Sequence, residues 1–170
     1  MNTVRSWMYE HGRPNRVAAL VNRGQVAILT AGLSPARWAA LEVRGRRTGR
    51  AISFPVVVAD YRGERYLVSM LGERANWVAN VRAAGGRAVI RHGRRQPVAL
   101  EEVSPEARAP ILKRYLALAP GARAHFPVAH SAPVAAFEAI AADYPVFRIC
   151  AAPPEPRVMS GPAKSMNEPR

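Results

Sequence analysis

The residues of this chain with the clearest capacity for chemistry lie in one short basic loop. The segment after Leu41 reads EVRGRRTGR, and the seven residues from Arg44 to Arg50 comprise four arginines, one threonine and two glycines. Arginine presents planar donors that match phosphate and carboxylate oxygens, and glycine lets backbone amides converge on one point. This composition predicts an anion-binding loop. The alternative is that these arginines are solvated charges.

No other segment has the residues of a reactive site. The four histidines lack metal-ligand spacing, and the sequence contains neither CxxC nor HExxH. Cys150, the only cysteine, lies in an apolar run, which indicates a buried inert thiol and excludes an internal disulfide. We therefore expect no metal site. The catalytic residues and the proton donor are left unassigned, although Tyr115 and Tyr144 are candidates for the donor.

Size and charge limit the class of protein. The chain has 170 residues, 49% of them hydrophobic, which suits one folded domain, and a net charge of +13. Such charge favours polyanionic ligands, nucleic acid or an anionic membrane surface, although a GC-rich genome also enriches arginine. We do not expect nucleic-acid binding, because the basic residues do not alternate with exposed aromatics.

The longest apolar stretch does not fit a membrane span. Residues 17–33 are interrupted by Asn22, Arg23 and Gln25, so they match neither a signal peptide nor a transmembrane helix. Their spacing instead predicts an amphipathic helix from Pro14 to Ala31. We expect a cytoplasmic protein, with peripheral contact to the inner face of the membrane as a further option.

Turn residues and hydrophobic periodicity divide the chain into three parts. Residues 1–13 are predicted to be a flexible N-terminus, 14–152 one domain, and 153–170 a disordered tail rich in proline. The expected strands are 38–43, 53–60, 65–70, 87–92, 95–103 and 144–150, and the expected helices are 74–83, 105–118 and 133–142. Strands in meander order with interspersed helices predict an α+β fold, a small antiparallel β-barrel with helices packed around it.

The order of several motifs resembles a known family. An apolar strand precedes Gly45-Arg46-Arg47-Thr48-Gly49, and Pro55 and then Trp77-x-x-Asn80 follow. This pattern is similar to the deazaflavin-dependent nitroreductase family over residues 15–150. The resemblance implies a split β-barrel and the coenzyme F420, which has a phosphodiester and an oligoglutamate tail. FMN, which related split barrels bind, is the second choice of cofactor.

The resemblance also implies roles for residues near the loop. Arg46, Arg47 and Thr48 would hold the phosphate and the tail. Pro55 and Val56 would lie against the deazaflavin ring, with the Val56 amide free to bond a ring carbonyl.

Further residues would complete this site. Ser69 and Met70 would lie near the phosphate or linker, and Trp77 and Asn80, one helical turn apart, would close the opposite side. Each has a structural alternative: Trp77 could be a core aromatic beside Val81, Asn80 could satisfy a local backbone group, and Ser69 could be an ordinary strand serine.

Three positions depart from the family pattern, namely Ile52, Phe54 and Met70. Members often have a basic residue, a polar residue and a lysine there. The changes remove two positive charges and one hydrogen-bonding group. Arg44, Arg50 or Arg74 could compensate.

The resemblance predicts an F420-dependent oxidoreductase that transfers a hydride from reduced deazaflavin to a hydrophobic acceptor such as a quinone, a nitro compound or an unsaturated ring. The alternative is a non-catalytic split barrel that binds a lipid or another hydrophobic ligand at an anionic membrane surface. The sequence fixes neither the acceptor nor the oligomeric state.

Overall fold

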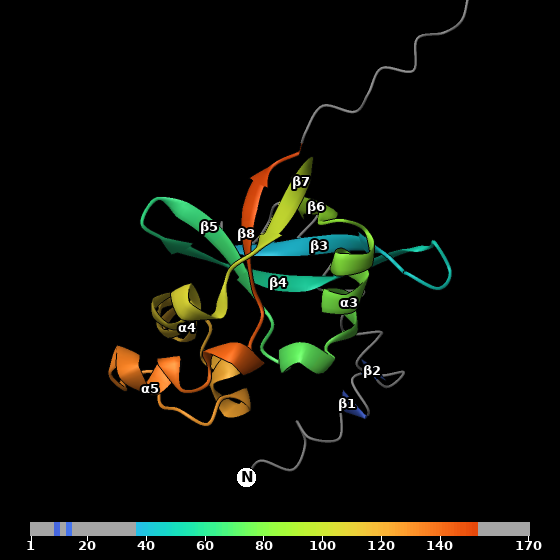
Figure 1. Ribbon diagram of the computed structural model, residues 1–170. Coiled ribbons are helices and arrows are strands. Elements are labelled where there is room, and N and C mark those ends of the chain that lie inside the picture. Colours follow the sequence, from blue (N-terminus) through green and yellow to red (C-terminus); the bar gives the residue numbers. More distant parts are fainter. Residues whose placement is uncertain (1–8, 11–12, 15–36, 153–170) are drawn as a thin grey trace, which may run out of the picture.

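Antiparallel strands form a closed barrel in the computed structural model, which describes residues 9–10, 13–14 and 37–152 (Figure 1). Neighbours around the barrel follow the order β3-β4-β5-β8-β7-β6, and β6 closes it by pairing with β3. The strands are β3 (Trp38–Arg44), β4 (Ala51–Tyr61), β5 (Glu64–Val68), β6 (Arg87–His92), β7 (Arg94–Glu102) and β8 (Val146–Ala151), with a separate pair β1 (Tyr9–Glu10) and β2 (Arg13–Pro14). The barrel and its helices confirm the predicted α+β fold.

Alternate side chains of the strands fill the barrel. Leu41 and Val43 of β3 are at most 2% exposed and belong to the same core cluster as Phe147 of β8. Successive side chains of a strand point to opposite faces, so the residues between them face outward. The strands are not paired along their whole length: β5 pairs only with Val58–Tyr61 of β4, so among the described strands the earlier part of β4 has a partner on its β3 side alone.

Helices form a second core outside the barrel. Helix α4 (Pro105–Leu118) packs on β4, and α5 (Val134–Glu138) packs on α4, below the barrel in Figure 1. Leu112 and Phe137 are fully buried there. The remaining helical elements are α3 (Asn76–Ala83) and the 3-10 helices η1 (Gly72–Arg74), η2 (Pro120–His125) and η3 (Ala141–Asp143).

The strand boundaries and the 105–118 helix match the predictions to within two residues, but two predicted helices are divided. Within residues 74–83, Arg74 is the last residue of η1 and α3 begins only at Asn76, because Ala75 between them adopts an extended conformation with φ −64° and ψ 123°. Residues 133–142 divide similarly into α5 and η3, and η2 is an additional element. These breaks matter because η1, η2 and η3 meet around one pocket.

Several predictions concern residues outside the described part of the chain. They are the helix over 14–31, the tail from 153 onward and almost all of the flexible segment 1–13. No helix among the described residues is long and apolar enough to cross a membrane.

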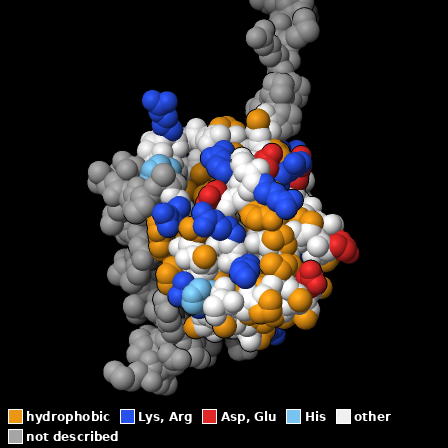
Figure 2. All heavy atoms as spheres, turned by 90° about the vertical axis from the view of Figure 1, so that its left-hand side faces the viewer, with side chains coloured by type: hydrophobic (Ala, Val, Ile, Leu, Met, Phe, Trp, Pro, Cys, Tyr) orange, Lys and Arg blue, Asp and Glu red, His pale blue; other side chains and the backbone are white. Residues whose placement is uncertain are grey.

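Basic and acidic side chains are mixed on the face of the barrel opposite the loop from Arg44 to Arg50. Figure 2 shows this face, with blue and red side chains interspersed among apolar ones. Among the described residues, Arg114 pairs with Asp60 at 3.0 Å and Arg148 pairs with Glu101 at 2.6 Å. Some of the positive charge of the barrel is therefore neutralised locally.

Candidate functional site

The loop between β3 and β4 is closed by its own backbone. The Gly45 amide donates to the Arg50 carbonyl at 2.9 Å, and the Gly49 amide donates to the Gly45 carbonyl at 2.8 Å. Gly49 has a φ of +65°, a conformation that suits glycine. Gly45 is buried, whereas the residues from Arg46 to Arg50 are exposed. The loop thus presents its side chains to solvent from a fixed backbone.

The cations of this loop have no acidic partners among the described residues. Arg44 donates to the Gly49 carbonyl at 3.1 Å, and the amide of Arg50 donates to the Thr48 hydroxyl at 3.4 Å. No ion pair reaches Arg44, Arg46, Arg47 or Arg50 in the part of the chain that the structure describes. Such unneutralised guanidinium groups suit phosphate or carboxylate oxygens.

Arg46 is turned toward helix α3 instead of outward. Its guanidinium Nη1 donates to Asn80 Oδ1 at 2.9 Å, and its backbone amide donates to the same oxygen at 3.2 Å. Two longer bonds of 3.4 Å join the guanidinium to the carbonyl and side-chain oxygens of Asn76. Asn80 is only 5% exposed. In this structure, therefore, Asn80 anchors the loop to α3.

Trp77 packs among aromatic side chains at the edge of the barrel core. Its ring centroid lies 5.3 Å from that of Phe147 and 6.2 Å from that of Phe54. Trp77 and Phe54 are each partly exposed. Ile52, two residues before Phe54, is 44% exposed. An apolar strip therefore lies beside the basic loop, at two of the three positions that depart from the family pattern.

The register of β4 corrects the expectation for the Val56 amide. The Val58 amide donates to the Arg37 carbonyl at 2.8 Å, and Val56 is opposite Ala39 in the same antiparallel register. Hydrogen-bonded pairs alternate along such a ladder, so the Val56 amide faces Ala39 and is not free for a ligand. Pro55, which has no N–H, occupies a position that faces the edge of β4 away from β3, where no described strand pairs with it.

Val56 and Pro55 also lie on opposite faces of β4. Val56 packs against the barrel core, whereas Pro55 points outward. Their side chains therefore face different surroundings, Val56 the barrel core and Pro55 the outside of the barrel.

Ser69 is fully buried and hydrogen-bonded within the protein. Its hydroxyl donates to the Gly72 carbonyl at 2.8 Å, and its amide donates to the Pro145 carbonyl at 2.9 Å. These bonds fix the chain where β5 turns into η1. Met70, the next residue, is half-buried and lines a pocket.

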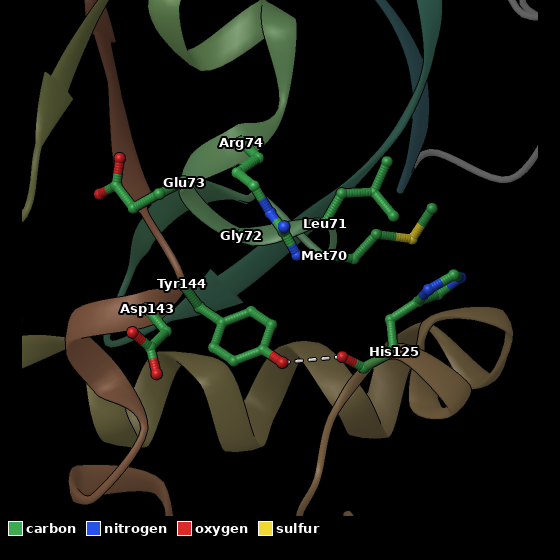
Figure 3. Close-up of a pocket in the computed structure, with 8 residues that line it drawn as sticks. All are labelled: Met70, Leu71, Gly72, Glu73, Arg74, His125, Asp143 and Tyr144. Atoms are coloured by element: carbon green, nitrogen blue, oxygen red, sulfur yellow. Dashed lines mark hydrogen bonds between the residues drawn. The ribbon is translucent and has the colours of Figure 1, made fainter. Parts of the chain in front are cut away.

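This pocket of about 400 Å³ lies between η1 on one side and η2 and η3 on the other (Figure 3). Its lining residues are Met70, Leu71, Gly72, Glu73, Arg74, His125, Asp143 and Tyr144.

The Tyr144 hydroxyl donates to the His125 carbonyl at 2.8 Å, and the Tyr144 ring stacks on Phe126 with centroids 4.1 Å apart. Burial raises the pKa of Tyr144. The Tyr144 hydroxyl is therefore a weaker acid, and so a poorer proton donor, than an ordinary tyrosine.

Gly72 lets the two walls of the pocket meet. Its φ is +69°, and a Cβ at this position would lie 2.9 Å from the Asp143 carbonyl oxygen. A larger residue would clash with the backbone there. Figure 3 shows Glu73 pointing away from His125, and Arg74 pointing toward Tyr144.

The loop and the pocket are connected through a few residues. Arg74 lines the pocket, and Asn76 bonds Arg46 of the loop. Of the residues predicted for the site, the structure brings Arg46 to Asn80 and places Met70 in the pocket. Sequence reasoning did not assign His125 or Asp143 to a site, because nothing local marks residues so distant in sequence as neighbours.

In the described part of the chain, no group of three or more histidine, cysteine or acidic residues is placed to hold a metal ion.

Comparison with known sequences decides the family. The family of F420H(2)-dependent quinone reductases matches residues 15–130. The chain belongs to this family. As a member of the quinone reductase family it is an F420-dependent oxidoreductase, and its acceptor is a hydrophobic molecule of the quinone type. The predicted coenzyme and reaction class are confirmed. No protein of curated function matches the chain.

Solved structures resemble the fold at low sequence identity. The protein Atu2129 from Agrobacterium tumefaciens, of unknown function, is 14% identical with a TM-score of 0.50, over 83% of this chain and 58% of that one. An F420-H2 dependent reductase named FDR-A is 16% identical with a TM-score of 0.45, over 67% of this chain and 94% of that one. At these identities the likeness concerns the fold alone.

Proposed function

We propose that this member of the quinone reductase family binds the anionic part of F420 on the loop from Arg44 to Arg50 and reduces a quinone in the pocket beside η1. The continuity of loop, α3 and pocket carries the proposal. Asn80 and Asn76 of α3 bond Arg46, and Arg74, just before α3, lines the pocket. A ligand held at the loop can therefore extend along α3 to the pocket.

The charges on the loop fit the anionic groups of F420. Arg47 and Arg50 are exposed and have no acidic partner among the described residues, so their donors are available to phosphate and carboxylate oxygens. Thr48 adds a hydroxyl. Arg46 contributes mainly by fixing the loop, because its guanidinium already bonds α3.

The apolar strip fits an aromatic ring. Trp77, Phe54 and Ile52 expose carbon beside the basic loop. Pro55 lies on the stretch of β4 whose second edge has no partner strand among residues 37–152, so backbone groups that do not face β3 have no ladder partner there. Val56 supports β4 by packing against the barrel core, and Ser69 supports the pocket by fixing the turn into η1.

When bound, reduced F420 supplies a hydride to the acceptor. The protein binds and orients the reactants and excludes water from them. Met70 and Leu71 supply apolar surface for the quinone. Arg74, which has no acidic partner in the described residues, places a cation where negative charge develops on the acceptor oxygen, and such a charge lowers the barrier.

Titration of the purified protein with F420, followed by tryptophan fluorescence, tests the proposed site. FMN is titrated in parallel, and oxidation of reduced F420 is then measured with menadione. We expect saturable F420 binding, little response to FMN, and menadione-dependent turnover that Arg74→Gln weakens. F420 binding that is unaffected by substitutions at both Arg47 and Arg50 would contradict the proposed site.

Peripheral association with an anionic membrane stays a prediction from the net charge of +13. Cosedimentation with phosphatidylglycerol vesicles, compared with neutral phosphatidylcholine vesicles at low salt, would test it. Absence of the protein from both pellets would contradict it.

A further inference from the structure

A chain of ion pairs runs behind the pocket and joins its two walls. Glu73 of η1 accepts two bonds from the Arg82 guanidinium, at 2.7 and 2.9 Å. On its other side Arg82 donates to both oxygens of Glu102, at 2.6 and 2.8 Å. Glu102 Oε1 also accepts from Arg108 Nη2 at 3.1 Å. One carboxylate, that of Glu102, is thus shared by two arginines.

Arg108 carries the chain to the opposite wall. It lies on α4 and is only 4% exposed. Its Nη1 donates to the carbonyls of Ala141 and Ala142 in η3, at 3.3 and 3.4 Å, and its Nε donates to the Val103 carbonyl at 2.8 Å. All three guanidinium nitrogens are therefore engaged, and Nη1 holds the backbone that leads into Asp143 of the pocket.

The two ends of this chain are both pocket elements. Glu73 belongs to the η1 wall, and Asp143 follows the two carbonyls that Arg108 holds. The walls also touch directly, since Gly72 leaves no room for a Cβ beside the Asp143 carbonyl. The contact sets how closely the walls approach, and the ionic chain resists their separation.

We propose that Glu102 is a positioning residue, which fixes the spacing of η1 and η3 and thereby the shape of the pocket. Its effect on the acceptor rests on the proposed function, in which the quinone occupies this pocket. Glu102 does not line the pocket, so it acts through Arg82 and Arg108.

The exposure of the link between Glu73 and Arg82 supports positioning over simple stabilisation for that part of the chain. The side chains of Glu73 and Arg82 are 46% and 42% exposed, and ion pairs at such exposure contribute little to global stability. Arg82 nevertheless binds both of its partners with two bonds each, an arrangement that restricts orientation strongly.

Glu101 provides a matched control for Glu102. It is the preceding residue of β7, and it pairs with Arg148 at 2.6 Å on the outer surface. Glu102→Gln and Glu101→Gln therefore make the same chemical change, and each breaks an arginine pair. Only the first lies on the path between the pocket walls.

Hydrogen–deuterium exchange and steady-state kinetics test the proposal. We expect Glu102→Gln to raise exchange in residues 70–75 and 139–145 together, and to raise the KM for menadione roughly two- to fivefold while the Kd for F420 stays constant. Glu101→Gln should change neither. Exchange that rises throughout the barrel, or equally in both variants, would overturn the proposal.

A second variant keeps the test decisive if Glu102→Gln does not fold. Arg82→Gln removes the central link and leaves the pair between Glu102 and buried Arg108 intact. It should raise exchange in residues 70–75 and increase the KM for menadione, and adding Glu102→Gln should have less than an additive effect, because both belong to one network. Fully additive effects of the two substitutions would mean that Arg82 and Glu102 do not belong to one network.

Failure of the proposed function gives a different result. In that case the wild-type protein would not oxidise reduced F420 with menadione, whereas the exchange difference between the Glu102 and Glu101 variants would persist. If wild-type turnover occurs but the exchange of the two segments does not respond to Glu102→Gln, the positioning role alone is wrong.

Discussion

Asn80 Oδ1 accepts hydrogen bonds from both the backbone amide and the guanidinium of Arg46, although Asn80 and Arg46 are 34 positions apart in the chain. Asn80 lies in the middle of α3 and is buried, and the two donors belong to the basic loop. This one oxygen therefore makes the two shortest of the four hydrogen bonds that join Arg46 of the loop to α3. Asn80 contributes to ligand binding by fixing the loop, whether or not it also contacts the ligand.

Asn80→Ala should weaken both the fold and the loop. It removes the acceptor of two donors, so we expect the free energy of unfolding to fall by about 1–3 kcal/mol. The Kd for F420 should rise because the loop loses its fixed position. Urea denaturation and fluorescence titration measure the two effects. Asn76→Ala, which removes one longer side-chain bond to Arg46, serves as the control and should have a smaller effect.

Arg47→Glu should weaken F420 binding by reversing a charge at the loop. Losing one hydrogen bond to a charged group corresponds to roughly a ten- to hundredfold rise in Kd, and salt should reduce the difference. Arg94→Glu makes the same charge change at the other end of β6 from the basic loop. Isothermal titration with both variants separates a local effect from net charge. Equal losses of affinity would mean that the loop has no specific role.

Gly72→Ala should disturb the pocket more than Gly85→Ala. Both glycines have positive φ, +69° and +60°, so alanine costs about 1–2 kcal/mol at either position. Only at Gly72 would the new Cβ meet another part of the backbone, the Asp143 carbonyl at 2.9 Å. Thermal unfolding should show the larger loss for Gly72→Ala, and only that variant should raise the KM for menadione. Identical behaviour would mean that the walls adjust freely.

Protonation of Glu73 should weaken the contact with Arg82 in acid. Hydrogen bonds from Arg82 lower the pKa of Glu73 from its ordinary value of 4.5. The folded-state pKa is below the unfolded one, so this stabilisation is present above pH 4.5 and is lost as the pH falls through the folded value. The small stability difference between the wild-type protein and Glu73→Gln should therefore shrink as the pH falls below 4.5. A difference that is independent of pH, measured by urea denaturation, would contradict a coupled pair.

Local patterns in the sequence were sufficient for the barrel and for the loop. Alternation of apolar residues such as Leu41 and Val43 depends only on the strand period, and the density of arginine and glycine between Arg44 and Arg50 is a property of consecutive residues. For the same reason the helix from Pro105 to Leu118 was predicted with its correct limits. The family motif added the coenzyme, because it lies within one continuous stretch.

Tertiary structure decided what the motif residues contact. Whether the Val56 amide is free depends on the register with Ala39, and the bond from Asn80 to Arg46 depends on how α3 packs beside the loop. The pocket joins Met70 to Tyr144, and Glu102 joins two arginines from different helices. Such contacts arise from the packing of elements that are distant in the chain, and no local preference encodes them.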